Sequence, residues 1–298
     1  YGPLHVGTDI GGSIRLPGTW QGLTALKPSE GLIPLDVPYD GRAAGPMTRT
    51  AADSIRLMSI VARPDERDYL TRPYAPMDWS TEPLSPAGMR VALQLDAGSG
   101  LPVEPETLAI VEAAAARFAA AGADIVPLAP FIGPEVLDGL VDFWRSRSYA
   151  DYELLSDAER ALILPFIAEW CAAGAGVTAA QTVRNRNQID EMARLTRAAT
   201  APYDLVLSPV SPVAAFPAED PMPITDPTQT MGHISFTVPY NMSGQPALSV
   251  GAGIQADGRT VGLQIAGRIG SDAELLRVAA WFETVRGADA EVDWARLP

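Results

Sequence analysis

The sequence is poor in the residues from which metal and redox sites are usually built. It contains one cysteine, Cys171, and two histidines, His5 and His233. These are too few for a zinc site of the usual Cys/His composition, and no ligand spacing appears. A single cysteine cannot close a disulfide within the chain, so nothing implies an oxidising compartment. We therefore expect a cytoplasmic protein that uses no metal and no other cofactor.

Basic clusters and long apolar runs are also missing. Lys27 is the only lysine, and the net charge of the 298 residues is −14. No cluster of arginines compensates, so neither nucleic acid nor an acidic membrane surface is expected as a partner. No stretch reaches the roughly 18 uncharged apolar residues that a membrane span needs. The 47% of hydrophobic residues is therefore expected to form the core of a soluble protein.

Helix and strand patterns alternate in the first half of the chain. We expect a helix capped by Thr50 and Asp53, followed by a strand, a helix and a strand over 90–95, 104–122 and 124–128. Strand–helix–strand units of this kind are typical of parallel or mixed sheets that helices cover. The predicted fold class is α/β, with a mixed β-sheet core covered by helices on both faces.

The middle of the chain, about 131–200, is predicted to be helical and is unusually aromatic. A capping box at Thr178 and Gln181 starts its last helix. By contrast, residues 1–50 are rich in glycine and proline and are expected to form tight loops and short strands. Residues 63–88 are expected to form a connection on the surface.

The C-terminal part is expected to add three strands and a final helix. The strands are predicted at 204–208, 247–250 and 261–266, and the helix is capped by Ser271. We interpret the whole chain, 1–298, as one continuous domain.

The stretch that indicates chemistry runs from Gly7 to Pro17 and contains Gly-Gly-Ser at its centre. Paired glycines before Ser13 allow backbone conformations closed to other residues and bring consecutive N–H groups together. Such a turn can bind the negative oxygen of a tetrahedral intermediate while the serine supplies the nucleophile. We expect Asp9 and Arg15 to pair and brace the loop. Taken alone, the pattern also fits a glycine turn with a structural role.

Other serine motifs are not met. A P-loop needs a lysine where a glycine precedes Ser13, and the β-lactamase pattern needs a lysine in place of Leu16. The G-x-S-x-G elbow is absent around this serine. A Ser–His–Asp triad needs His5 or His233, and we interpret both as loop or core residues. Cys171 is interpreted as a helix-packing residue.

The Gly7–Pro17 run closely resembles the core of the amidase signature, and three further blocks follow the order of the same family. They are Gly22, Leu26-Lys27-Pro28 and Gly31; Gly45-Pro46-Met47-Thr48-Arg49-Thr50 with Asp53; and Phe236-Thr237-Val238-Pro239-Tyr240-Asn241 with Gly244, Pro246-Ala247 and Gly262-Leu263-Gln264. Four ordered blocks argue against chance. The chain is identified as a member of the amidase signature family of serine amidohydrolases.

The resemblance implies a Ser–Ser–Lys mechanism. The nucleophile maps onto Ser13, and the oxyanion-hole amides map onto Ile10, Gly11 and Gly12, with Ser13 as a further donor. Family members pass the proton of the nucleophile through a second serine, on a cis peptide bond, to a buried neutral lysine. Burial lowers the pKa of a lysine towards the range where it works as a base.

The sequence departs from the family at this point. The catalytic lysine and the bridging serine of the family lie upstream of the nucleophile loop, in a segment that this chain does not contain. Lys27 matches the later Leu-Lys-Pro block and is interpreted as structural. We expect the missing groups to come from an N-terminal segment that is omitted here, cleaved, or carried on a separate chain.

In relatives, the variable central helices line the acyl-binding site. The candidates for substrate contact are therefore Phe143, Trp144, Phe166 and Trp170, which favour a hydrophobic or aromatic acyl group. We expect hydrolysis of a carboxylic amide, or a related aryl amide or hydrazide, through a seryl acyl-enzyme. The alternatives are a glutamine-hydrolysing A-type subunit of an amidotransferase and a non-catalytic relative. A homodimer accords with general trends, but no residue argues for one.

Overall fold

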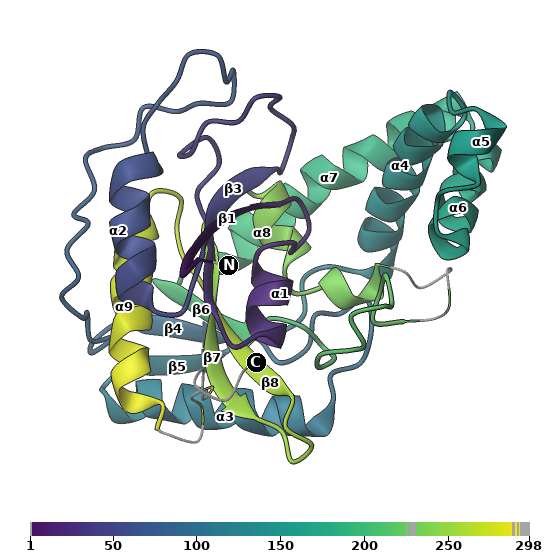
Figure 1. Cartoon of the computed structure of the whole chain (residues 1–298). Helices are drawn as coiled ribbons and strands as arrows, with labels where there is room; N and C mark the ends of the chain where they lie inside the picture. Colours follow the sequence, from purple (N-terminus) through teal and green to yellow (C-terminus); the bar gives the residue numbers. More distant parts are fainter. Residues whose placement is uncertain (1, 225, 227–230, 288–289, 291, 293–298) are drawn as a thin grey trace.

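The computed structural model describes residues 2–224, 226, 231–287, 290 and 292. Within them, eight strands form one sheet in the order β1-β3-β2-β7-β8-β6-β4-β5 (Figure 1). The strands are β1 (Leu4–Asp9), β2 (Thr24–Lys27), β3 (Ala43–Thr48), β4 (Arg90–Leu93), β5 (Asp124–Pro127), β6 (Leu205–Pro209), β7 (Ala247–Ile254) and β8 (Thr260–Ala266). Strand β4 runs parallel to β5 and β6, whereas the other neighbours are antiparallel. The mixed sheet of the predicted α/β fold is confirmed.

Helices precede or follow most of these strands. They are α1 (Arg15–Trp20), α2 (Ala51–Val61), α3 (Pro105–Ala120), α4 (Pro134–Tyr152), α5 (Asp157–Arg160), α6 (Pro165–Ala172), α7 (Ala179–Thr200), α8 (Val238–Met242) and α9 (Asp272–Val285). None of the helices in the described part of the chain is long and apolar enough to cross a bilayer.

The two faces of the sheet are covered by different helices because side chains alternate along each strand. Leu248 and Val250 of β7, with Leu263 of β8, join the main hydrophobic cluster, to which α2, α3 and α9 contribute. The intervening residues Ser249 and Gln264 point to the opposite face, where α1 packs across β7 and β8. Helices therefore cover both faces, as predicted.

The helices α4 to α7 extend away from the sheet (Figure 1). Helix α4 packs along α7 and against α6. Their shared core, which we call the helical cluster, also takes in residues from α1 and from the loop that precedes α8. Its buried residues are Leu16, Ile132, Val136, Leu137, Leu140, Val141, Trp144, Trp170, Cys171, Ile189, Met192, Val210, Ile234, Val238 and Met242. The loop that carries Ser13 is thus connected to the helical region through α1.

Most predicted boundaries are confirmed to within a few residues. The Thr50 hydroxyl accepts the Asp53 N–H at the start of α2, and the capping box of Thr178 and Gln181 is present at α7. Ser271 is the N-cap residue of α9, as predicted, but its Oγ donates to the Arg268 carbonyl oxygen and makes no capping hydrogen bond.

Helix α1 was not predicted. It is six residues long and contains Pro17 and Gly18, which are poor helix formers, so residues 1–50 show no helical period. The helix forms here because its residues Leu16 and Thr19 are buried between the sheet and the helical cluster.

Candidate active site

The loop between β1 and α1 presents Ser13 to solvent while its neighbours are buried. Gly12 adopts a φ of 134°, which L side chains rarely adopt. A Cβ atom there would lie 2.6 Å from the Thr237 hydroxyl and 2.7 Å from a methyl of Leu16, so only glycine fits. Ser13 is exposed, whereas Gly12 and Ile14 on either side of it are buried. The turn therefore exposes the Ser13 hydroxyl to solvent while the residues next to it stay buried.

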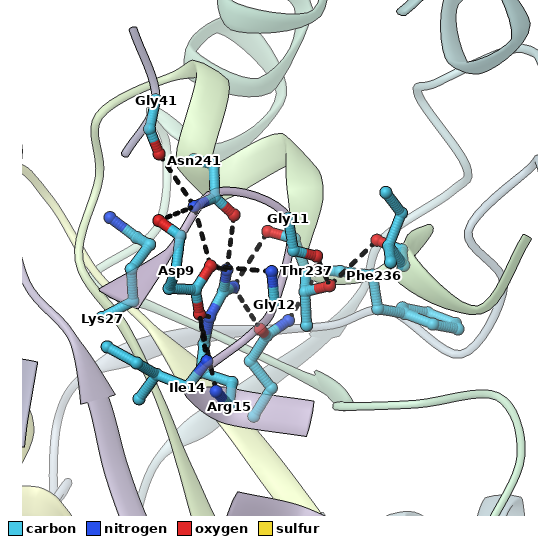
Figure 2. A network of polar contacts seen from close by, with 12 residues as sticks. Asp9, Gly11, Gly12, Ile14, Arg15, Lys27, Gly41, Phe236, Thr237 and Asn241 are labelled. Carbon is cyan, nitrogen blue, oxygen red and sulfur yellow. Dashed lines mark hydrogen bonds and ion pairs between the residues drawn. The ribbon is translucent and has the colours of Figure 1, made fainter. Parts of the chain in front are cut away.

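The carboxylate of Asp9 holds this turn through hydrogen bonds to its backbone (Figure 2). It accepts the N–H of Gly12 at 2.7 Å and of Ile14 at 3.2 Å, and it pairs with the Arg15 guanidinium at 3.1 Å. Burial alone would raise the pKa of Asp9, but Arg15 and the hydrogen bond from Asn241 outweigh it and hold the pKa below its ordinary value. The predicted Asp9–Arg15 pair is confirmed.

The C-terminal blocks satisfy the rest of this buried pair. Arg15 donates to the Thr237 carbonyl oxygen at 2.9 Å, to Gln264 Oε1 at 2.9 Å and to Asn241 Oδ1 at 2.6 Å. The Asn241 amide in turn donates to Asp9 Oδ1 at 2.8 Å. We call these five residues the Asp9–Arg15 network. Because buried charges are costly unless every partner is present, the network holds the loop in one arrangement.

The predicted oxyanion amides differ in their partners. The Gly12 N–H donates to Asp9, while the Gly11 carbonyl oxygen accepts the Thr237 hydroxyl at 2.5 Å. In the part of the chain that the structure describes, the N–H groups of Gly11 and Ser13 donate to no other residue. These two amides are therefore able to donate to a developing oxyanion, whereas Gly12 would have to share its bond with Asp9.

Ser13 forms part of the wall of a cavity of about 480 Å³, which we call the aromatic cavity. Two of the four predicted contact residues, Trp144 and Trp170, line it. Phe143 packs beside the helical cluster instead, and Phe166 is half-buried outside the lining. The remaining lining comes from the loop between β1 and α1, from α1, from α4 and from the loop before α8: Ile10, Gly11, Leu16, Pro17, Trp20, Arg147, Ser148, Phe216, Pro221, Met222, Pro223, Met231, His233 and Ile234.

Several of these lining residues were missed from the sequence. Trp20 is the last residue of α1, a helix that the sequence did not predict, so its place in the wall of this cavity was not expected. Its ring packs edge-on against Phe216 with centroids 4.9 Å apart. Phe216, Met222 and Met231 belong to a proline-rich loop without periodicity, so no spacing signal was available for them.

Ser13 also lines a second, smaller cavity of about 270 Å³, which we call the polar cavity. Its other lining residues are Thr8, Ile10, Tyr39, Arg42 and Arg147. The guanidinium carbon of Arg147 lies 4.0 Å from the centroid of the Tyr39 ring. The exposed serine therefore stands between an apolar space and a basic one.

A larger cavity of about 860 Å³ lies elsewhere, between α4 and residues 96–102. Asp96, Asp138 and Asp142 are among its lining residues, and it shares only Met231 with the aromatic cavity. None of the predicted site residues lines it, so its size does not make it the candidate active site.

Lys27 is buried close to the Asp9–Arg15 network. Its Nζ donates to the Pro28 carbonyl oxygen at 2.6 Å, and no hydrogen bond among the described residues joins it to Ser13. Burial, together with the positive charge of Arg15, lowers the pKa of Lys27 to about 7. This placement fits the structural interpretation.

The histidines and the cysteine occupy three different settings. His5 is exposed on β1, with its ring nitrogen 2.6 Å from the Gly2 carbonyl oxygen. His233 is buried and lines the aromatic cavity. Cys171 belongs to the helical cluster, and burial raises the pKa of its thiol, so the predicted packing role is confirmed.

Comparison with known proteins bears on these observations. Residues 1–276 match the family model described as Amidase. The chain is 34% identical over 295 residues to an acylamidase of Rhodococcus erythropolis, an alignment that covers 96% of this chain and 62% of that protein. It is 32% identical over 326 residues to the A-type subunit of the glutamyl-tRNA(Gln) amidotransferase of Myxococcus xanthus, with 93% of this chain and 63% of that protein covered.

A solved structure, that of a 6-aminohexanoate cyclic dimer hydrolase, is similar to this chain with a TM-score of 0.80 and 25% identity. The match covers 98% of this chain and 66% of that one. The chain thus spans about 62% of the length of the acylamidase that it matches. With the family model matching most of its residues, the chain belongs to the amidase family, as its four sequence blocks predicted.

Proposed function

We propose that this chain carries the nucleophile and much of the substrate site of an enzyme that hydrolyses carboxylic amides. The observation that carries the proposal is the placement of Ser13. Among residues 9–16 it alone is exposed, and it lies in the wall of a cavity lined by aromatic side chains. Membership of the amidase family and similarity to an acylamidase support the same chemistry.

In the proposed reaction, Ser13 Oγ attacks the carbonyl carbon of the amide and forms a tetrahedral intermediate. The amides of Gly11 and Ser13, with Ile10 and Gly12 as further members of the predicted set, donate to its negative oxygen. Collapse breaks the C–N bond, and the amine leaves with a proton. Water then attacks the seryl ester and releases the carboxylic acid, which regenerates the serine.

The proton of Ser13 needs an acceptor. Its Oγ makes no hydrogen bond to another described residue, and Lys27 is directed at Pro28. We infer that the acceptor is the bridging serine and lysine that the family resemblance implies, supplied from outside these residues. This inference accords with the alignment to the acylamidase, which covers 62% of the length of that protein.

The aromatic cavity supports an apolar acyl or aryl group as the main substrate contact. Three tryptophans, Trp20, Trp144 and Trp170, share its lining with Phe216. Its volume of about 480 Å³ is typical of sites for small molecules. Because the chain is also similar to amidotransferase subunits, glutamine hydrolysis is the second candidate function. The apolar lining favours the hydrolase, because the side chain of glutamine is short and polar. With a single cysteine in the sequence, we retain the cytoplasm as the proposed location.

Labelling with a fluorophosphonate probe, followed by intact mass and peptide mapping, tests the proposal. We expect the adduct on Ser13. The Ser13→Ala variant should lose labelling and about a thousandfold or more of its amide hydrolysis. Ser59→Ala, which alters an exposed serine on α2 away from the cavity, should keep both. Labelling of another residue, or an active Ser13→Ala variant, would show that the nucleophile is elsewhere.

A further inference from the structure

We propose that the polar cavity binds a carboxylate of the substrate. The preferred amides would then carry an apolar group on one side of the scissile bond and a carboxylate on the other. This inference deepens the proposed function and rests on Ser13 being the nucleophile. It starts from the position of Ser13, which lines the aromatic cavity and the polar cavity at once.

The polar cavity holds two arginines without acidic partners. Arg42 and Arg147 line it, and neither forms an ion pair within the described residues. Some arginines elsewhere form ion pairs, as Arg186 does with Asp40 and Asp190 at 2.7 and 3.1 Å. The exposed Arg63 and Arg184 form none within the described residues. Arg42 and Arg147 differ from these two because they line one cavity together beside the proposed nucleophile. An anionic ligand would compensate their joint positive charge.

The geometry of Arg147 suits carboxylate recognition. Its guanidinium stacks on the Tyr39 ring at 4.0 Å, which leaves the N–H edge of the fork available. A guanidinium edge binds a carboxylate through two parallel hydrogen bonds. Arg147 also lines the aromatic cavity, so it stands at the boundary between the two spaces. A carboxylate held there would lie close to the bond that Ser13 attacks.

The charges also select against a free amino acid. The lining residues of the polar cavity include two guanidinium groups and no carboxylate. In glutamine the α-ammonium group is on the same carbon as the carboxylate, so it would enter the polar cavity with it and meet like charge without a described counter-ion. An amide with a carboxylate but no ammonium fits better, which favours N-acylated acids or monoamides of dicarboxylic acids over glutamine.

The experiment uses the natural protein that carries this chain and compares its activity on pairs of matched substrates. N-(Phenylacetyl)glycine has its carboxylate on the amine side, and N-phenylsuccinamic acid has it on the acyl side. Their neutral counterparts replace the carboxylate by an isopropyl group of similar shape: N-isobutylphenylacetamide and 4-methylpentananilide. In at least one pair we expect kcat/KM for the acid to exceed that of the neutral amide by about tenfold or more, the size of a charge-assisted hydrogen bond. The pair that shows the preference tells which side of the bond faces the arginines.

The variants assign the preference to the cavity. Arg42→Gln and Arg147→Gln should each lower the ratio of kcat/KM for the acid to kcat/KM for the neutral amide by about tenfold. Arg147→Lys should retain part of the preference, because it keeps the charge but not the fork. Arg184→Gln, an exposed arginine on α7, is the matched control and should change neither substrate.

Three outcomes separate this inference from the proposed function. If the neutral amides are hydrolysed at least as fast in both pairs and Ser13 is labelled, the inference fails and the proposed function stands. If the arginine variants lower both members of a pair equally, Arg42 and Arg147 support the fold rather than the substrate, and the inference fails. If no amide is hydrolysed and Ser13 stays unlabelled, the proposed function itself fails.

Discussion

The two walls of the candidate site are held by different kinds of interaction. On the sheet side, the loop that carries Ser13 is held by buried charges, since Asp9 and Arg15 are both almost fully inaccessible. On the helix side, α4 and α6 present Trp144 and Trp170, which pack within an apolar cluster. A charge network permits one geometry, because any missing partner leaves a buried charge unsatisfied. An apolar wall tolerates exchange between hydrophobic residues of similar volume. Under the proposed function, reaction geometry would therefore depend mainly on the first wall and the choice of apolar group on the second.

The helical wall has one polar exception. The indole N–H groups of Trp144 and Trp170 are buried and have no hydrogen-bond partner among the described residues. Buried indole N–H groups usually find an acceptor. The two tryptophans thus combine apolar surface with donors that the fold itself does not use, which distinguishes them from the phenylalanines on the same helices.

The largest predicted effect comes from breaking the network on the sheet side. Arg15→Met leaves the Asp9 carboxylate buried without its counter-ion, so we expect the free energy of unfolding to fall by about 3–5 kcal/mol. Urea unfolding measures it. Arg186→Met, which removes a partly exposed arginine paired with Asp40 and Asp190, should cost less than about 1 kcal/mol. Equal losses in the two variants would contradict the distinction between the walls.

A second prediction concerns the pH dependence of stability. The pKa of Lys27 is about 7 in the folded chain, below the value of about 10.4 in the unfolded chain. Between these values the unfolded state binds a proton that the folded state does not. The free energy of unfolding should therefore rise with pH over this window, by up to about 1.4 kcal/mol per pH unit. Below the folded pKa both states are charged, and the cost of burying the charge is constant.

Denaturant unfolding between about pH 7 and pH 10 checks this slope. Lys27→Met should remove it, because no titratable group then remains at this position. Arg184→Met, which changes an exposed arginine, should keep it. A slope that survives in Lys27→Met would mean that other groups produce it.

The smallest predicted effect lies in the helical wall. Trp170→Leu removes aromatic surface from the cavity, so kcat/KM for phenyl-bearing amides should fall by roughly tenfold while the fold is kept. Phe166→Leu on the same helix changes a side chain outside the lining and should alter kcat/KM by less than about twofold. Steady-state kinetics of both variants gives the comparison, and similar losses would show that the aromatic cavity is not the substrate site.

The sequence predicted much of the structure on the sheet side of the site. The alternation of strands and helices predicted the α/β fold, and the spacing of Asp9 and Arg15 suggested their pairing. The hydrogen-bond partners of that pair belong to the family blocks, but the sequence did not predict their contact with Arg15. Thr237 and Asn241 lie more than 220 residues away from Arg15, and such a separation carries no local signal.

The cavity walls were harder to predict. Phe166 and Trp170 are four residues apart on α6, so their spacing places them on a similar face, yet only Trp170 reaches the lining. The position of α6 relative to the sheet decides this, and helical period does not report it. The loop before α8 supplies Phe216 and Met231 without any repeating pattern.

The Asp9–Arg15 network also has a consequence for the order in which contacts form during folding. Arg15 lies near the start of the chain, but its acceptors are 222, 226 and 249 residues further on. Contacts of such high sequence separation form late, because long loops must close first. A chain still being synthesised cannot bury Arg15 until β8 has been made. The loop that carries Ser13 therefore reaches its final geometry only when the sheet is complete, and a chain that ends before β8 would not hold Ser13 in this position.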